Sequence, residues 1–261
     1  MEYLRVSHNH QHCTSSTIQQ SPTMKAASFI LAAISVVSAQ DTTLCKLYGY
    51  YSSNGYEILN NLWGKDAATA GSQCTFVDSV SDMGTKWHSN WTWSGGENNV
   101  KSYVYSGRLI TKKPVSQYTN LQTEASWAYD TNNIRCNVAY DLFTAQDVNH
   151  TTSSGDYELM IWLARYNVYP IGTSQGMVTV GGRTWELYYG LNGSMKVYTF
   201  ITSTGPISNF TSDLKDFFTY LTNSKNYPAS TQNLITYQFG SEAFTGGPAT
   251  FTVNKWSANA S

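Results

Sequence analysis

Two glutamates stand in segments whose alternation places them on the polar face of a β-strand. The first, Glu158, lies in the run 157–163, where every second residue is apolar. Because side chains alternate across a strand, Glu158 shares its face with Met160 and Trp162. A carboxylate, a thioether and an indole in one row suit the floor of an exposed groove. A carboxylate on an ordinary solvent-facing strand is the simpler alternative.

The second glutamate, Glu242, lies in the segment 234–244, whose first part, residues 234–239, we predict to be a regular strand. Alternation puts Glu242 on the same face as Thr236, Gln238 and Gly240. The opposite face is apolar and carries Ile235, Tyr237 and Phe239.

A third predicted strand, residues 134–143, carries Asn137 and Asp141 on one face, so we expect these polar faces to line one groove. Two carboxylates across a groove are what glycoside hydrolysis needs. One acts as nucleophile or base, and the other protonates the leaving oxygen. Pairs of carboxylates also arise by chance, so this pattern favours the chemistry without establishing it.

The composition indicates an uncharged polar ligand. Charged residues make up 13% of the 261 residues, aromatic residues make up 14%, and the formal net charge is −1. An average soluble protein has roughly 25% charged residues. Nucleic acid is not expected as a partner, because phosphate binding needs a basic patch. Sugars are the obvious candidates, and we expect the protein to be a monomer.

The beginning of the chain is typical of a secretory signal peptide. Lys25 precedes the apolar run 26–37, and Val37-Ser38-Ala39 forms a small-residue cleavage site. The run has 12 residues, fewer than the roughly 20 that span a bilayer, so no membrane anchor is expected. We assign residues 1–23 to an unstructured upstream extension, or alternatively to a long n-region, and residues 24–39 to the signal peptide. Residues 40–261 then form one secreted, extracellular catalytic domain.

The sequence lacks the residue patterns of metal-dependent, serine-nucleophile and nucleotide-hydrolysing enzymes. After the leader only His88 and His150 remain, and no HExxH-type spacing occurs, so we expect no metal site. The sequence also has no GxSxG nucleophile motif and no GxxxxGK[ST] phosphate-binding loop. We therefore expect no cofactor.

Three cysteines follow the leader, and a secreted chain oxidises those that can meet. Cys45 and Cys74 lie near the start of the domain, beside turn-forming or polar residues, and we predict a disulfide between them. Cys136 then stays free. It alternates with Val138 and Tyr140, which favours a buried, small apolar side chain over a reactive thiol.

Short alternating runs rich in Val, Ile, Thr, Tyr and Trp dominate the domain, separated by turn signals such as Gly181-Gly182. One segment has helical spacing instead, with Leu214, Phe217, Phe218 and Leu221 following Asp213. Many strands and one short helix predict an all-β sandwich or jelly roll. The other predicted strands are 86–93, 100–109, 125–129, 177–180, 184–189, 195–200 and 249–253.

The segments SGDYELMIWLA (154–164) and YQFGSEAFTG (237–246) closely resemble the two catalytic blocks of glycoside hydrolase family 12, the small fungal endoglucanases. Further blocks resemble the same family in the same order, and the resemblance runs from about Cys45 to Trp256. These blocks are NNLWG (60–64), WTWSGG (91–96), VKSY (100–103), NVAYDLFT (137–144) and PIG (170–172).

The resemblance implies a β-jelly roll of two curved antiparallel sheets that cleaves β-1,4-glucan with retention of configuration. It implies Glu158 as nucleophile and Glu242 as acid/base. Asp141 would hydrogen-bond to Glu158, and it should lie beside Glu158 and not beside Glu242. Trp63 would stack on a sugar, and Asn137, Met160 and Trp162 would line the groove. The pair Cys45–Cys74 matches the family's single disulfide.

Three residues depart from the family's pattern: Ala243 stands where Pro is frequent, Ser241 where Thr is usual, and Cys136 where a small residue such as Ala is common. None of these changes removes a catalytic group. We expect the surroundings of the two glutamates to drive their pKa values apart. A xyloglucan-specific enzyme is the nearest alternative, and a non-catalytic secreted carbohydrate binder is a remote one.

Overall fold

The structure is a computed structural model, and it describes residues 42–261. The predictions for the upstream extension, the signal peptide and the first mature residue lie outside this part of the chain. No helix within residues 42–261 is long and apolar enough to cross a membrane.

One sheet, here called the inner sheet, carries the segments that resemble the catalytic blocks. Its strands pair in the order β2-β3-β6-β15-β8-β9-β12-β11-β10, and a short strand, β14, also pairs with β8. All these pairings are antiparallel except that of β12 with β9, which is parallel. The bounds are β2 (Tyr50–Ser53), β3 (Tyr56–Leu59), β6 (Ser102–Arg108), β8 (Ile134–Ala145), β9 (Tyr157–Tyr166), β10 (Thr173–Val180), β11 (Arg183–Asn192), β12 (Met195–Thr202), β14 (Asn233–Leu234) and β15 (Gln238–Ala260).

The second sheet, here called the outer sheet, has the order β1-β4-β5-β15-β7-β13 and is antiparallel throughout. Two 3-10 turns, η1 (Lys65–Ala67) and η2 (Val115–Gln117), lie in the connections. The bounds of its remaining strands are β1 (Thr43–Leu44), β4 (Ala70–Ser81), β5 (Gly84–Ser94), β7 (Leu121–Tyr129) and β13 (Asn209–Asp213).

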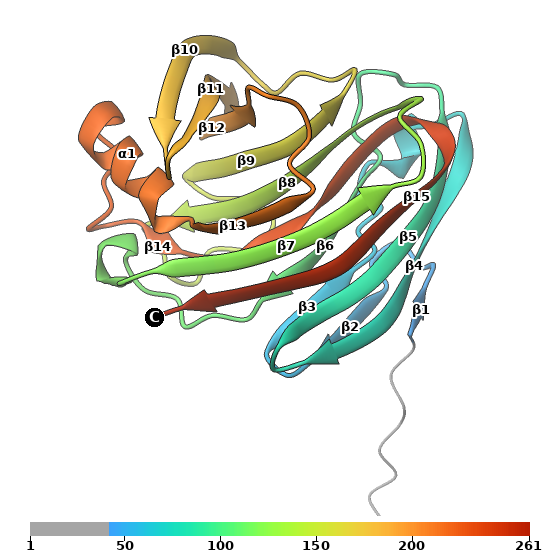
Figure 1. Ribbon diagram of the computed structural model, residues 1–261, viewed down its shortest axis with the longest axis horizontal. Helices are drawn as coiled ribbons and strands as arrows, with labels where there is room; N and C mark the ends of the chain where they lie inside the picture. Colours follow the sequence, from blue (N-terminus) through green and yellow to red (C-terminus); the bar gives the residue numbers. More distant parts are fainter. Residues whose placement is uncertain (1–41) are drawn as a thin grey trace, which may run out of the picture. The chain divides into compact units, whose positions relative to one another are not determined.

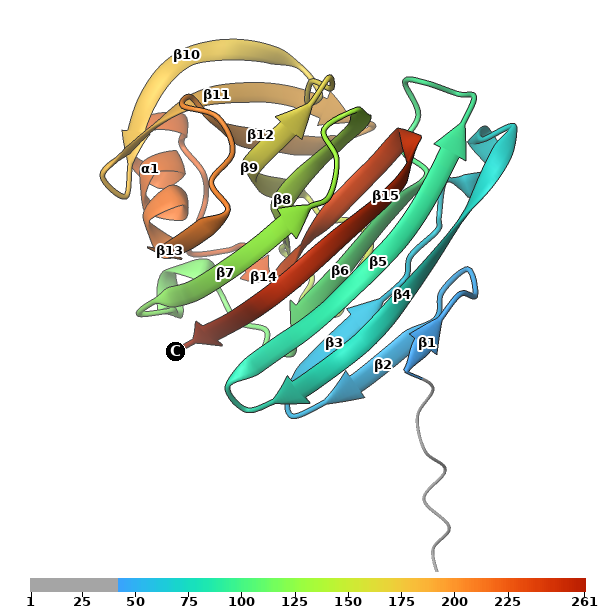
Figure 2. The ribbon, with the colours of Figure 1, turned by 45° about the vertical axis from the view of Figure 1, so that its right-hand side comes forward.

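The long strand β15 belongs to both sheets (Figure 1, Figure 2). Its first part pairs with β6 and β8, and its second part pairs with β5 and β7. The change of sheet falls at Gly246 and Gly247, whose φ angles of 115° and 92° favour glycine. A Cβ atom on Gly247 would lie 2.5 Å from the carbonyl oxygen of Trp91. Glycine is therefore required where the strand bends.

The hydrophobic core fills the space between the sheets. Trp256 and Phe251 from the outer-sheet part of β15 meet Phe239 from its inner-sheet part, and all three are fully buried. The Phe239 and Trp256 rings stack with centroids 6.4 Å apart. Burying a large apolar side chain contributes about 1.5–3 kcal/mol. Because alternate residues of the inner sheet point into this core, the residues between them point away from it, onto the opposite face.

The predicted helix is present as α1 (Lys215–Lys225). Asp213 Oδ1 accepts a hydrogen bond from the amide of Lys215, which satisfies a free donor at the start of the helix. Phe217 packs edge-on against Phe200 of β12 and Trp185 of β11. The helix thus covers the core side of the inner sheet beyond the outer sheet, beside β10–β12 (Figure 2).

The fold is the predicted all-β jelly roll, and the Cys45–Cys74 disulfide is present. Cys136 is free and buried. One predicted strand is wrong in part, because residues 235–237 interrupt the run 234–239. Phe143 donates its amide hydrogen to Thr236 Oγ1, 2.9 Å away, where a regular ladder would use a backbone carbonyl. As a result Ile235 packs with Phe143 instead of joining the core between the sheets.

Candidate active site

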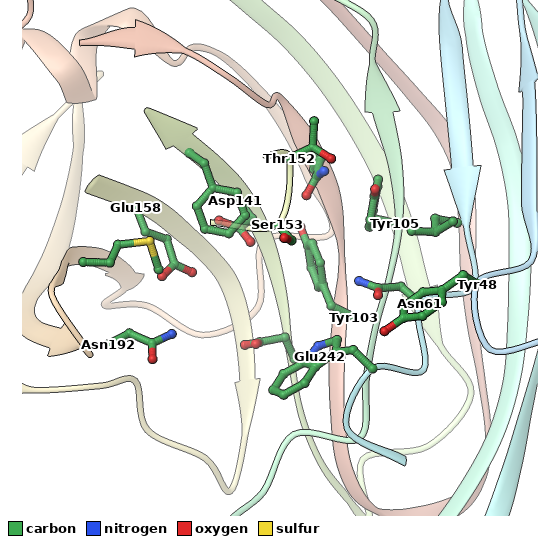
Figure 3. Close-up of a pocket in the computed structure, with 15 residues that line it drawn as sticks. Tyr48, Asn61, Tyr103, Tyr105, Asp141, Thr152, Ser153, Glu158, Asn192 and Glu242 are labelled. Atoms are coloured by element: carbon green, nitrogen blue, oxygen red, sulfur yellow. The ribbon is translucent and has the colours of Figure 1, made fainter. Parts of the chain in front are cut away.

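An open cavity of about 480 Å³ lies on the face of the inner sheet that is turned away from the core. Glu158 of β9 and Glu242 of β15 extend into it from different sides, and Asp141 of β8 lies between the strands that carry them (Figure 3). The cavity therefore brings together three carboxyl groups from adjacent strands: Glu242 of β15, Asp141 of β8 and Glu158 of β9. Its other lining residues are Tyr48, Leu59, Asn61, Trp63, Tyr103, Tyr105, Phe143, Thr152, Ser153, Asn192, Met195 and Gln238.

Glu158 has a carboxyl group as its neighbour. Phe143 is its cross-strand partner on β8, and Asp141 lies diagonally from it on the same face, within reach of a side chain. Asp141 donates a hydrogen bond to Glu158, which favours the ionised form of Glu158. Asp141 Oδ1 is buried without a hydrogen-bond partner among the described residues. Asp141 thus stands beside Glu158, and with only 8% of Glu158 exposed the solvent-facing alternative is wrong.

Glu242 has an amide as its neighbour. Asn137 Nδ2 donates to Glu242 Oε2 at 2.5 Å, and Asn137 Oδ1 accepts from the amide of Glu242 at 2.9 Å. One side chain therefore holds both the carboxyl group and the backbone of the same residue. Asn137 is itself fully buried and does not line the cavity, so the prediction that it lines the groove is wrong; it lies behind Glu242 and holds that residue in place.

A hydrogen-bonded chain runs from the outer sheet to Asn137. Trp91 Nε1 donates to the hydroxyl of Tyr129 at 3.1 Å, and that hydroxyl shares a 2.7 Å hydrogen bond with Ser241 Oγ. Ser241 Oγ in turn donates to the backbone carbonyl of Asn137 at 2.5 Å. Cys136 contacts the same hydroxyl groups, so two of the three departures from the family's pattern meet behind Glu242.

Burial raises the pKa of all three carboxyl groups. The pKa of Glu158 rises to about 8 through burial and then through the negative charge of Glu242, and the Asp141 hydrogen bond lowers it. Burial raises the pKa of Glu242 to about 7, and the Asn137 hydrogen bond lowers it. The pKa of Asp141 lies well above its usual value because of burial and the two like charges. The expectation that the surroundings separate the pKa values of the two glutamates is therefore wrong, because burial raises both values.

The chain matches known proteins along its length. The family model "Glycosyl hydrolase family 12" matches residues 54–261. The protein belongs to glycoside hydrolase family 12. Endoglucanase A of Aspergillus kawachii is 50% identical over 227 residues, which are 85% of this chain and 94% of that protein. A xyloglucan-specific endo-beta-1,4-glucanase A of Emericella nidulans is 38% identical over 239 residues, 88% of this chain and 98% of that protein.

Solved structures of the family share the fold. The catalytic domain of Humicola grisea Cel12A, determined with a soaked thio cellotetraose, is 53% identical and superposes with a TM-score of 0.83. The match covers 84% of this chain and 99% of that one. The protein is accordingly an enzyme of the endoglucanase type, and its family consists of glycoside hydrolases.

Aromatic side chains with different exposure line the cleft. Trp63 lines it with 54% of its surface exposed, as a platform for a sugar ring would be. Tyr103 and Tyr105 also line it, with ring centroids 5.4 Å apart, and Tyr103 donates to the carbonyl of Ala139. We did not predict these tyrosines as site residues. Their alternation with the buried Val104 was the signal that would have found them.

Met160 and Trp162 share the face of Glu158, as alternation predicts, but the structure does not bring them to the cleft surface. They are 5% and 2% exposed and pack against Ala139, Val168 and Ile201. Neither lines the cavity. Among residues 42–261, no group of three or more His, Cys, Asp or Glu side chains is arranged to hold a metal ion.

Proposed function

We propose that this protein is a secreted endo-β-1,4-glucanase that cleaves internal glucosidic bonds by double displacement, with retention of configuration. Glu158 is the nucleophile and Glu242 is the acid/base. The observation that carries the proposal is one cleft in which two carboxyl groups, the buried Glu158 and the half-buried Glu242, have different hydrogen-bond partners. Glu158 accepts a hydrogen bond from Asp141, and Glu242 accepts one from the side-chain amide of Asn137.

In the first step the Glu158 carboxylate attacks the anomeric carbon, and a covalent glycosyl-enzyme bond forms as the glycosidic bond breaks. Glu242 gives its proton to the leaving oxygen. Asp141 keeps its own proton in the bond that it donates, so Glu158 is the member of that pair that carries the charge. Burial raises the pKa of both glutamates, so the working state is the one in which the pair has lost a single proton, and the hydrogen bond from Asp141 favours Glu158 as the residue that carries the charge.

In the second step Glu242, now ionised, takes a proton from a water molecule, and the water oxygen attacks the anomeric carbon. The bond to Glu158 breaks, and its carboxylate is restored. Retaining enzymes hold the two carboxyl groups about 5–5.5 Å apart, whereas inverting enzymes need about 6.5–9.5 Å. The exposed indole of Trp63 supplies an apolar platform for an uncharged glucan chain.

Product stereochemistry tests the mechanism. Proton NMR of freshly released sugar should show the β-anomer first, before mutarotation mixes the signals. An initial α-anomer would contradict both the double displacement and the role of Glu158.

The substrate class has a second candidate, because a relative of 38% identity is named a xyloglucan-specific enzyme. Rates on carboxymethylcellulose, barley β-glucan and xyloglucan, measured side by side, separate the two. We expect higher kcat/KM on the unbranched glucans, since the 50%-identical relative is named an endoglucanase without that restriction. Activity on xyloglucan alone would favour the alternative, and binding without hydrolysis of any of the three would favour a carbohydrate binder.

Secretion has its own test. Sequencing of the N-terminus of the extracellular protein should begin at Gln40. An extracellular form that still contains residues 1–23 would contradict the assigned signal peptide.

A further inference from the structure

A fully buried lysine lies next to the strand that carries Glu242. Lys101 has 0% of its surface exposed and forms no ion pair within the described part of the chain. Its Nζ instead donates to three backbone carbonyl oxygens: Gly96 at 2.6 Å, Asn99 at 2.7 Å and Phe244 at 3.0 Å. An ammonium group has three donors, so all of them are used.

The three carbonyl groups come from two distant parts of the chain. Gly96 and Asn99 belong to the turn between β5 and β6, which a backbone hydrogen bond from Asn99 to Gly96 closes. Phe244 belongs to β15, two residues beyond Glu242. A buried charge is costly unless it is compensated, and here the compensation depends on β15 holding its position beside the turn.

The backbone of Lys101 reinforces the same contact. Its amide donates to the carbonyl of Ala243 at 2.8 Å, immediately before the register pair of Ser102 with Ala243 and of Tyr103 with Glu242. Its carbonyl accepts from the amide of Gly64, the residue after Trp63. Lys101 therefore stands where the acid/base strand, the turn 96–99 and the segment of the aromatic platform meet.

Glu242 is thus held from two sides. On the β8 side, Asn137 binds its carboxyl group and its amide. On the β6 side, Lys101 donates to the carbonyl groups of Ala243 and Phe244, the two residues that follow Glu242 in the chain. Glu242 lies just before the bend at Gly246 and Gly247, where β15 leaves the inner sheet and its pairing becomes irregular.

We propose that Lys101 is a positioning residue for the acid/base: its ammonium group fixes the backbone after Glu242 and so directs the Glu242 carboxyl group at the leaving oxygen. This inference rests on the proposed role of Glu242. A single cationic nitrogen with three donors can join two backbone segments, which an apolar side chain of similar length cannot do.

The test exploits the dependence of acid catalysis on the leaving group. Proton donation contributes about 10²–10⁴-fold when the leaving group is a poor one, such as a sugar alcohol. It contributes little when the leaving group is 2,4-dinitrophenolate, which departs without a proton. We therefore compare kcat/KM on cellohexaose and on 2,4-dinitrophenyl β-cellobioside for the wild type and Lys101→Met. For Lys101→Met we expect a loss of at least about tenfold on cellohexaose and less than about threefold on the dinitrophenyl glycoside.

Two reference variants accompany the test. Glu242→Gln should show the same selectivity in stronger form, and if it does not, the proposed role of Glu242 fails whatever Lys101 does. Lys215→Met is the matched control, because Lys215 Nζ also donates to backbone carbonyls, those of Val115 and Tyr118, at the start of α1. It should alter stability without changing the ratio of the two kcat/KM values.

If Lys101→Met gives no folded protein, Lys101→Gln is measured instead, and because its amide has two donors in place of three and no charge, it should show the same substrate selectivity in weaker form. Equal losses on both substrates, or no loss on either, would overturn the positioning role while leaving that of Glu242 intact. Such a result would reduce Lys101 to a residue that closes the turn 96–99.

Discussion

The two sides of the cleft differ in the hydrogen-bond partner that each supplies to its glutamate, while desolvation raises the pKa of both residues. On the β9 side Glu158 meets another carboxyl group, Asp141, which can donate only while it keeps its proton. On the β15 side Glu242 meets the amide of Asn137, which donates at every pH. Burial raises both pKa values, whereas the hydrogen-bond partners distinguish the two carboxyl groups.

The largest expected effect is the loss of activity on replacing either glutamate, and the two losses should depend differently on the substrate. Glu158→Gln removes the attacking oxygen and should lower kcat by at least about 10³-fold on every substrate, because no bond to the anomeric carbon can form. Glu242→Gln should spare kcat/KM on 2,4-dinitrophenyl β-cellobioside. The measurement is steady-state kinetics on activated and unactivated glucosides. Retention of more than about a tenth of wild-type turnover by Glu158→Gln would show that the nucleophile is assigned wrongly.

The partners should control opposite limbs of the pH profile. Asp141→Ala removes the bond that lowers the pKa of Glu158, so that pKa rises and the acidic limb of kcat/KM moves to higher pH. Asn137→Ala removes the bond that lowers the pKa of Glu242, so the basic limb moves to higher pH. Each shift should be about one pH unit, since a hydrogen bond to a charged group is worth about 1.5–3 kcal/mol.

Asp141→Asn is the control for the acidic limb, because its amide still donates to Glu158. The acidic limb of its kcat/KM profile should lie at nearly the same pH as that of the wild type. If Asp141→Ala moved only the basic limb, or Asn137→Ala only the acidic one, the assignment of partners to roles would be reversed.

A smaller effect concerns stability. The pKa of Glu158 is raised from 4.5 to about 8 in the folded protein, so folding favours its protonated form. Its contribution to stability is then complete below the unfolded value and is lost as the pH rises through the folded value. The Glu158→Gln variant does not lose this stability at high pH, because glutamine does not ionise. Its Tm should exceed that of the wild type by on the order of 5 °C at pH 8–9 and match it near pH 4. A constant difference across this range, measured by calorimetry, would contradict the raised pKa.

The smallest effect concerns Cys136, behind Glu242. Burial raises the pKa of its thiol to about 12, so the native protein should not react with a thiol reagent at pH 8 until it is unfolded. Cys136→Ala should cost about 1 kcal/mol of stability, or roughly 2–4 °C in Tm, and leave kcat/KM unchanged. Rapid labelling of the folded protein would show that this region opens.

Alternation along strands predicted which residues of β8 and β9 face away from the core, and the resemblance of two segments identified the glutamates. The sequence did not predict how crowded that face is. Met160 and Trp162 point the expected way, but they pack with Val168, from the segment that directly follows β9, and with Ile201 of the neighbouring strand β12. Side-chain period carries no information about sheet curvature or about what packs on top of a face.

The hydrogen bonds around Glu242 were also beyond prediction. Asn137 was expected on the polar face, but its double contact with Glu242 depends on the register of β8 with β15, which the pattern leaves open. The break at residues 235–237 has a similar origin, because the hydroxyl of Thr236 replaces a backbone partner of Phe143. Propensity and period do not encode such competition between side chain and backbone.

The double membership of β15 has a consequence for the order in which the protein can fold. β15 follows every other described strand in the chain, yet it is the partner of β5 and β7 in the outer sheet and of β6 and β8 in the inner sheet. While the ribosome still holds residues 238–260, those four strands have unpaired edges, which invite association with other chains. Neither sheet can close during synthesis, so this fold assembles after translation of β15 and depends on protection of its open edges until then.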